Sequence, residues 1–279
     1  MDRIRKFKNK KICIVSNDAG GAEILRSLTS SFQGNFKFLL SGPALKIFSK
    51  KKKFFDIKKT IKSCDVVFTG TSSKSDLEYN AIEYCNSIDK KVYSFLDHWV
   101  NYKKRFIRKN RVILPNKIIL GDKFAMEIAK KLFKNIFYFR NPYWKEIKKK
   151  IKKKNYRALD TILFVSSNID RLNNKKYNDK YILNKCLNYI DSHKKIKKII
   201  IRPHPSEQKT KYKNIISGKI KVEFDKNKTL IKSFNKAGMV CGHNSMAMVV
   251  GKICGLKSIN INLKRIRNTI PLFYIDKSI

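Results

Sequence analysis

The chain has 279 residues, of which 42% are apolar, enough for one large domain or two small ones. Its formal net charge is +43, from 64 Lys and Arg against 21 Asp and Glu. Lys dominates and is spread over nearly every segment, whereas phosphate-reading proteins favour Arg. Compositional bias therefore explains most of the charge, and a nucleic-acid-binding protein is the least favoured functional class.

Several other classes are excluded by pattern. No stretch reaches 18 apolar residues, and no apolar segment follows the basic N-terminus as in a secretory signal. The six cysteines form no CxxC pair and no zinc-like cluster with histidine, so neither a metal nor another cofactor is expected. We therefore expect a cytoplasmic protein in a reducing compartment, with peripheral contact to the inner membrane face left open.

Strands and helices alternate along the first half of the chain. Short apolar, β-branched runs predict strands, and the segments between them have helical spacing or open at Pro43. The predicted strands are 11–16, 36–40, 65–69, 91–96, 117–120 and 137–139. The predicted helices are 22–30, one from 43, 76–87 and one from 121–122.

The same alternation restarts after a basic segment. Strands are predicted at 161–165, 199–201, 221–224, 239–241 and 258–261, the last of which is expected to close the sheet. Helices are predicted at 181–192, 229–236 and 246–254. The pattern indicates an α/β protein of GT-B type, with two facing Rossmann-like domains built on parallel sheets. The expected boundaries are 1–142 for an N-terminal acceptor-side domain, 143–158 for a basic linker helix and 159–279 for a nucleotide-donor domain.

Polar residues follow the predicted strands of the first half, at the sheet edge where open α/β proteins bind ligands. The turn with Asp18, Gly20 and Gly21 opens a helix, and Asp18 is either a proton acceptor or an ordinary helix cap. The turn is not GxGxxG, so a dinucleotide is not expected.

A second polar loop follows the strand 91–96. We expect Asp97 and His98 to hydrogen-bond or exchange protons and Trp99 and Tyr102 to stack on a sugar or base, the alternative being a packed loop with a satisfied histidine. The acceptor-binding candidates are Gly20, Gly21, Trp99, Asn101, Tyr102 and Arg105, and the catalytic candidates are Asp18, Asp97 and His98.

The second half carries the most informative segment, three isoleucines that run into Arg202, Pro203, His204 and Pro205. The prolines fix the backbone on both sides of His204, and a cation beside an imidazole at a strand end suits a phosphate. The alternative is a surface turn that happens to hold a histidine. Two more polar strand ends are predicted to adjoin it, at Ser166, Ser167 and at Gly242, His243, Asn244, Ser245.

The helix of Lys145–Lys154 carries Trp144, Ile147 and Ile151 at helical spacing. A basic helix with a thin apolar stripe is compatible with docking on anionic lipid headgroups. A solvated linker helix is the alternative.

The pairing of His204-Pro205 with the later Asn244-Ser245 turn resembles the HP and S motifs of bacterial sialyltransferases and Kdo transferases, which are GT-B glycosyltransferases using CMP-linked ulosonic acids. CDP-glycerol polymerases of wall teichoic acid synthesis have a similar turn. The Asn17-Asp18-Ala19-Gly20 segment is only loosely similar to the acidic motif that supplies the base in the sialyltransferases.

The resemblance implies metal-independent transfer from a CMP-ulosonic acid or a UDP-sugar to a glycan or lipid-linked acceptor of a surface polysaccharide. It implies donor phosphate contacts at His204 and Ser245 and nucleotide contacts at Ser166 and Ser167, and Arg202 would neutralise the leaving nucleotide. Small GT-B proteins also include nucleotide-sugar hydrolases and 2-epimerases of nonulosonic acid pathways, which form the second hypothesis.

Overall fold

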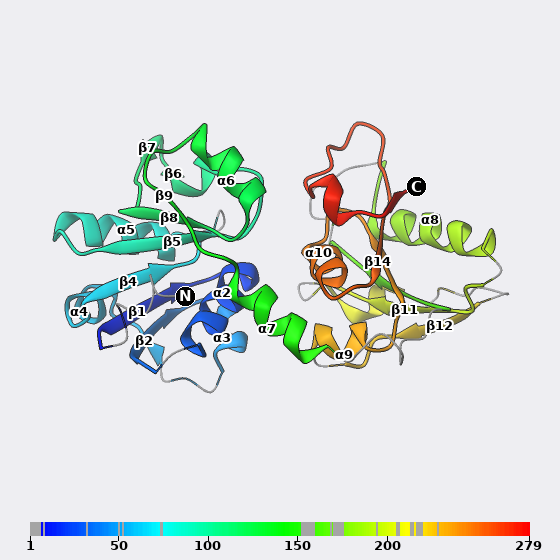
Figure 1. Cartoon of the computed structure of the whole chain (residues 1–279), viewed down its shortest axis with the longest axis horizontal. Helices are drawn as coiled ribbons and strands as arrows, with labels where there is room; N and C mark the ends of the chain where they lie inside the picture. The colour runs from blue at the N-terminus through cyan, green and yellow to red at the C-terminus, as the bar shows by residue number, and fades with distance from the viewer. Residues whose placement is uncertain are drawn as a thin grey trace. The chain divides into compact units, whose positions relative to one another are not determined.

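The computed structural model describes residues 7, 9–31, 33–49, 51, 53–72, 75–151, 160–167, 169, 176–193, 195–204, 207–212, 215, 220–227 and 229–279. The chain divides into two compact units, Met1–Glu146 and Ile147–Ile279. Each is an α/β unit on a parallel sheet (Figure 1). In the part of the chain that is described, no helix is long and apolar enough to cross a bilayer.

The N-terminal unit contains a seven-stranded sheet in the order β3-β2-β1-β4-β5-β8-β9, and every described pairing in it is parallel. Its strands are β1 (Lys11–Ser16), β2 (Asn35–Leu40), β3 (Lys53–Phe54), β4 (Val66–Thr69), β5 (Val92–Leu96), β8 (Lys117–Leu120) and β9 (Ile136–Tyr138). Its helices are α2 (Ala19–Thr29), α3 (Ala44–Ile47), α4 (Ile57–Lys62), α5 (Leu77–Ser87), η1 (Lys103–Phe106) and α6 (Lys123–Lys130).

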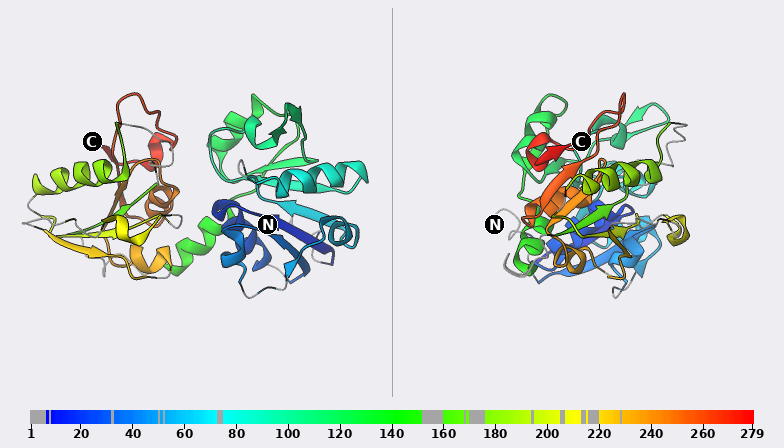
Figure 2. Two further views of the ribbon diagram at one scale, coloured as in Figure 1. Left: turned by 180° about the vertical axis from the view of Figure 1, so that it is seen from behind. Right: turned by 90° about the vertical axis from the view of Figure 1, so that its right-hand side faces the viewer.

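The C-terminal unit contains a six-stranded parallel sheet in the order β12-β11-β10-β13-β14-β15. Its strands are β10 (Thr161–Val165), β11 (Lys198–Arg202), β12 (Lys221–Phe224), β13 (Met239–Gly242), β14 (Lys257–Asn260) and β15 (Lys277–Ser278). Its helices are α8 (Asp179–Asp191), η4 (Lys209–Tyr212), α9 (Leu230–Phe234), α10 (Met246–Ile253) and η5 (Leu272–Tyr274). Figure 2 shows helices and sheet from two further sides.

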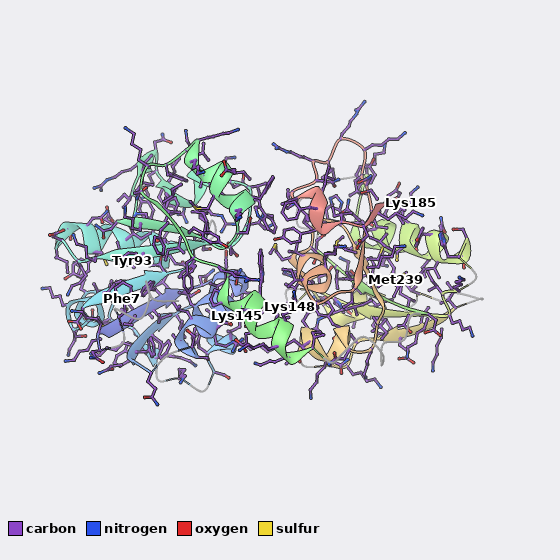
Figure 3. The ribbon with its side chains drawn as sticks, in the orientation of Figure 1. Phe7, Tyr93, Lys145, Lys148, Lys185 and Met239 are labelled. Atoms are coloured by element: carbon purple, nitrogen blue, oxygen red, sulfur yellow. The ribbon has the colours of Figure 1, made fainter. Side chains whose placement is uncertain are left out.

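The central strands of both sheets are buried because they are apolar along most of their length. Ile12, Ile14 and Val15 of β1 are fully buried, as are Ile162, Leu163 and Phe164 of β10. A parallel strand covered on both faces has this continuous apolar sequence rather than an alternating one. Figure 3 shows the consequence: Phe7 and Tyr93 lie inside the first unit, whereas Lys185 projects from α8.

In each sheet, the direction in which the chain adds successive strands reverses at one place. In the first unit the chain builds outward from β1 to β3, then returns to the other side of β1 with β4. In the second it builds from β10 to β12 and returns beside β10 with β13. The carboxyl ends of β1 with β4, and of β10 with β13, are therefore the two switch points where doubly wound sheets bind ligands.

The end of the second sheet and several short elements differ from the sequence-based expectation. The strand at 258–261 does not close its sheet, because β15 pairs with β14 beyond it. The short elements β3, α4 and the antiparallel hairpin of β6 (Ile107–Arg108) and β7 (Arg111–Val112) were not predicted. Two-residue strands carry no measurable periodicity, so pairing partners alone create them.

The basic helix α7 (Pro142–Lys150) is shorter than predicted, and residues 152–159 of the expected linker lie outside the described part of the chain. Lys145 and Lys148 project from it (Figure 3). Its apolar stripe is turned inward instead, since Trp144 lies 6.3 Å from the Trp99 ring and Ile147 is buried. Ile151, the third residue of the predicted stripe, is half-buried, and contact of this helix with anionic lipid stays a prediction.

All six cysteines are buried free thiols. Cys13 and Cys241 lie in β1 and β13, as their apolar surroundings predict. Three cysteines belong to each unit, with Cys13, Cys64 and Cys85 in the first and Cys186, Cys241 and Cys254 in the second.

Candidate functional site

The first switch point brings together the turns that follow β1, β2 and β4. The Asn17 side-chain amide donates to Asp18 Oδ1 at 2.7 Å and to Ser72 Oγ at 3.3 Å, while its Oδ1 accepts from Ser41 Oγ at 2.8 Å. One side chain thus joins three strand ends. Asp18 is only half-buried, and as the residue before α2 it makes no side-chain cap bond, so its second oxygen is available to a ligand.

Gly20 and Gly21 are required by close packing inside the unit. A Cβ at Gly20 would lie 2.0 Å from Asp97 Oδ2, and one at Gly21 would lie 3.0 Å from the Gly70 Cα. The Asp97 carboxylate therefore stands against the first turn of α2, where the helix dipole favours an anion. A protein carboxylate already occupies the place that a ligand phosphate would take.

Asp97 is held in that position by Arg105. The guanidinium Nη1 donates to Asp97 Oδ1 at 2.7 Å and also to Thr71 O and Oγ1 at 2.8 and 3.0 Å. Both charged side chains are largely buried, at 14% and 13% exposure. Arg105 is therefore committed to a clamp between the ends of β4 and β5, which limits its predicted contact with an acceptor.

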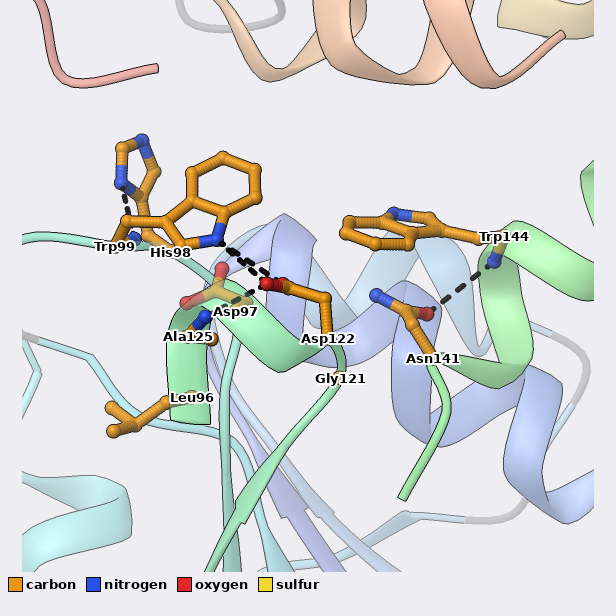
Figure 4. A pocket seen from close by; sticks show the side chains of 9 residues that line it. All are labelled: Leu96, Asp97, His98, Trp99, Gly121, Asp122, Ala125, Asn141 and Trp144. Carbon is orange, nitrogen blue, oxygen red and sulfur yellow. Dashed lines mark hydrogen bonds between the residues drawn. The ribbon is translucent and has the colours of Figure 1, made fainter. Parts of the chain in front are cut away.

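The loop after β5 closes a small pocket in the same unit (Figure 4). Trp99 Nε1 donates to both oxygens of Asp122, at 3.1 and 3.3 Å, and burial raises the pKa of Asp122. The nine lining residues are Leu96, Asp97, His98, Trp99, Gly121, Asp122, Ala125, Asn141 and Trp144.

The predicted aromatic platform is mostly part of the core. Trp99 and Tyr102 are 5% and 2% exposed, so their burial argues against stacking on a sugar or base. His98 Nδ1 accepts the Trp99 amide hydrogen at 3.0 Å, and burial lowers the pKa of His98, which favours a neutral ring. Asn101 is exposed with a left-handed φ of 60°.

Glu78 was not predicted, yet it lies at the centre of this switch point. It is 2% exposed in the first turn of α5, and its Oε1 accepts the Asn17 amide hydrogen at 2.7 Å. Burial, followed by the negative charges of Asp18 and Asp97, raises the pKa of Glu78 to about 7. A glutamate in a first helical turn is usually an ordinary dipole partner, so its sequence gave no functional signal.

The second switch point assembles most of the predicted donor-binding residues. The Ser166 amide donates to Arg202 O at 3.2 Å, and Val165 pairs with Gly242 across β10 and β13. A Cβ at Gly242 would lie 2.4 Å from Val165 O, so only glycine fits there. Pro205 lies outside the described residues.

A buried ionic network ties the Ser166 turn to the His204 turn. Ser166 Oγ donates to Asp179 Oδ1 at 2.9 Å, and the Lys211 ammonium bridges Asp179 at 2.8 Å and Glu207 at 2.5 Å. Glu207 in turn accepts the His204 amide hydrogen at 2.7 Å. Two predicted binding turns are thus held by three charged residues that the sequence did not single out.

The two buried carboxylates of this network differ in their proton affinity. Burial raises the pKa of Asp179. Burial also disfavours charge on Glu207, but hydrogen bonds, from Lys211 above all, lower its pKa below the usual value. Glu207 is therefore the ionised partner of Lys211 near neutral pH, and its charge fixes the backbone at His204.

The Arg202 guanidinium already makes hydrogen bonds within the C-terminal unit. Its Nη1 contacts Asp225 Oδ2 at 2.5 Å, Asn227 O at 3.0 Å and Ser233 Oγ at 3.1 Å. The Asp225 side chain is fully buried, and although burial works against its charge, hydrogen bonds from Ser233 and Arg202 lower the pKa of its carboxyl. Neutralising a leaving nucleotide would require Arg202 to share this bond, so its predicted role is restricted.

The turn after β13 offers an anion site at the N-terminus of α10. His243 is 2% exposed; its Nδ1 pairs with Ile261 O at 2.8 Å, and burial lowers its pKa. This contact and its burial restrict the predicted contact of His243 with a donor phosphate. Ser245 precedes α10, is 8% exposed and makes no cap bond, which leaves its hydroxyl and the helix amides for a ligand.

Asn244 connects this turn to a basic loop. It has a left-handed φ of 50°, accepts the Thr269 amide hydrogen at 2.7 Å and donates to Arg267 O at 3.0 Å. The exposed Lys264, Arg265 and Arg267 therefore belong to a loop fastened beside the α10 N-terminus. Across the turn, the buried Ser167 hydroxyl makes no hydrogen bond within the described residues.

The two sheet edges consequently differ in charge. The first presents Asp18, Asp97 and the buried Glu78, with Arg105 as the cation paired to Asp97. The second presents serine hydroxyls, a helix N-terminus and exposed cations. Among the described residues no three His, Cys, Asp or Glu side chains are grouped closely enough to hold a metal ion.

No protein-family model matches the chain, and no curated protein matches it. Several solved structures do match it. MnaA of S. aureus in complex with UDP is 11% identical, with 91% of this chain and 79% of that chain covered and a TM-score of 0.67.

Two further structures span the same two units. A putative UDP-N-acetylglucosamine 2-epimerase from Listeria monocytogenes is 12% identical over 90% of this chain and 78% of that one, with a TM-score of 0.64. The UDP-GlcNAc 2-epimerase from Methanocaldococcus jannaschii is 14% identical over 91% and 85%, with a TM-score of 0.59. At these identities the likeness establishes architecture, and the chain has the GT-B fold, two Rossmann-like units each built on a parallel sheet.

Proposed function

We propose that the chain is an enzyme of nucleotide-activated sugars that transfers the sugar to a hydroxyl acceptor. The observation that carries the proposal is the opposite chemistry of its two sheet edges. One offers hydroxyls, helix amides and cations, which suit a nucleotide phosphate; the other offers carboxylates, which suit proton removal from an acceptor.

The donor side belongs to the C-terminal unit. Ser245 and the α10 amides would bind the phosphate, and the Ser167 hydroxyl and the His204 imidazole are further candidates for donor contacts. The exposed cations of the 264–267 loop would offset its charge, since Arg202 is already paired with Asp225. A CMP-ulosonic acid is the favoured donor because of the HP-type and Ser-type turns, and a UDP-sugar is the second choice.

The acceptor side belongs to the N-terminal unit. The acceptor hydroxyl oxygen forms a bond to the anomeric carbon while the bond from that carbon to the phosphate oxygen breaks. The hydroxyl proton goes to a carboxylate, for which Asp18 is the candidate because Asp97 is held by Arg105. The nucleotide leaves with the electron pair. The acceptor would be a glycan or a lipid-linked glycan of a surface polysaccharide.

Calorimetric titration with CMP, CDP, UMP and UDP tests the donor side. We expect binding of at least one nucleotide, and loss of that binding in Ser245→Ala and in His204→Ala. His193→Ala, just after α8, is the matched control for His204→Ala and should bind as the wild type does. Absence of binding by every nucleotide would refute the proposal.

A second function, hydrolysis or 2-epimerisation of a nucleotide sugar, is favoured by the fold likeness to structures named as UDP-GlcNAc 2-epimerases. The two functions differ in their need for an acceptor. Release of free sugar or an epimer from UDP-GlcNAc without acceptor would support the second function. Turnover that depends on added glycan would support transfer.

A further inference from the structure

Glu78 is buried more completely than its place in a helix requires. An acid in a first helical turn interacts favourably with the dipole without being buried, yet Glu78 is 2% exposed. Its Oε2 is buried and has no hydrogen-bond partner within the described residues. Burying a carboxyl oxygen without a hydrogen bond costs free energy of folding, so we expect this group to have a role that offsets the cost.

The carboxyl group holds the turn that carries the candidate base. Glu78 Oε1 accepts the Asn17 amide hydrogen at 2.7 Å, and the Asn17 side chain donates to Asp18 Oδ1 at the same distance. The orientation of Asp18 is thus set by a chain of two bonds that begins at Glu78.

We propose that Glu78 is the positioning residue of the acceptor site, fixing Asp18 through the hydrogen bonds of Asn17. This inference rests on the proposed function. The charged groups around Glu78 are Asp18 from the turn after β1 and Asp97 from the loop after β5, the latter paired with Arg105. With three carboxylates and one paired cation, protonation of Glu78 relieves repulsion of an ionised Asp18.

Two substitutions separate the effect of the hydrogen bond to Asn17 from the effect of the negative charge on Glu78. Glu78→Gln keeps an oxygen for the Asn17 amide but cannot ionise, whereas Glu78→Ala removes the oxygen as well. We expect kcat to fall about tenfold in Glu78→Ala with donor KM unchanged, and to recover in Glu78→Gln. The pH profile of kcat/KM should lose its inflection near pH 7 in Glu78→Gln. Glu83→Gln, on the same helix and ion-paired on the surface with Arg111, is the control.

A second readout does not depend on turnover. The Asn17 amide should exchange its hydrogen slowly in the wild type and in Glu78→Gln, and about tenfold faster in Glu78→Ala. Unchanged exchange in Glu78→Ala overturns the inference even if the enzyme is active. Altered exchange in a chain that turns over no nucleotide sugar overturns the proposed function instead and leaves Glu78 as the holder of the turn.

Discussion

Lys211 offers the sharpest test of the C-terminal site, because it is the cation between two buried carboxylates. Asp179 and Glu207 side chains are 0% and 2% exposed, and that of Lys211 is 16% exposed. Replacing Lys211 with Met keeps the apolar stem but leaves both acids without their ammonium partner. Removing one member of a buried ion pair costs about 3–5 kcal/mol, a large part of the stability of an ordinary domain.

The cost should depend on pH in a definite direction. Without Lys211 the pKa values of both carboxyls rise in the folded state, so the folded chain retains protons that the unfolded chain releases. Stability then falls as pH rises through this window, and the variant should be weakest at pH 8 and closest to wild type near pH 5. Urea unfolding followed by circular dichroism at both pH values measures the difference.

Lys130→Met is the matched control, since Lys130 makes a surface pair with Glu127 at 56% and 66% exposure. Its cost should stay below about 0.5 kcal/mol at either pH. The network would be shown to be energetically unimportant if Lys211→Met and Lys130→Met unfolded at the same urea concentration. Full recovery by Lys211→Met/Glu207→Gln would show that Glu207 alone carries the penalty.

Three further predictions concern other sites. Burial gives Glu78 a pKa of about 7 against 4.5 ordinarily, so ionising it destabilises the wild type as pH rises. The free energy of unfolding of Glu78→Gln should therefore gain about 3 kcal/mol relative to wild type between pH 4 and pH 8. A difference in urea midpoints that does not change with pH would contradict this. Gly242→Ala places a Cβ against Val165 O and should cost about 1–3 kcal/mol, so an unchanged melting temperature would show that β13 can shift. Trp99→Phe removes the hydrogen-bond donor to Asp122. At pH values above the pKa of Asp122 it should lower the free energy of unfolding by about 1–3 kcal/mol; an equal loss at all pH values would show that this bond is not the cause.

The sheets were predictable because apolar runs specify buried parallel strands. The strands 11–16, 117–120, 161–165 and 221–224 were predicted to the residue. The end of the second sheet was not, because β15 has two exposed residues and exists only through its pairing with β14. Even the edge strand β12 has enough β-branched and aromatic sequence to be predicted, whereas the two-residue β15 is defined by its pairing alone.

The site was predictable in position but not in its contacts. His98, His204 and His243 follow strands β5, β11 and β13, as expected for a ligand-binding edge. Which of them is free to act depends on partners distant in sequence, such as Ile261 for His243. Glu78 and Lys211 show the same limit, because a buried charge in a helix cannot be recognised until its neighbours are known.

Each unit contains three buried cysteines, so the reactivity of their thiols can report the unfolding of each unit separately. A folded unit shields its three cysteines from alkylating reagents, and an opened unit exposes them. Brief alkylation followed by peptide mass spectrometry would therefore follow each unit separately, without added labels. In Lys211→Met, cysteines 186, 241 and 254 should become reactive at lower urea than cysteines 13, 64 and 85.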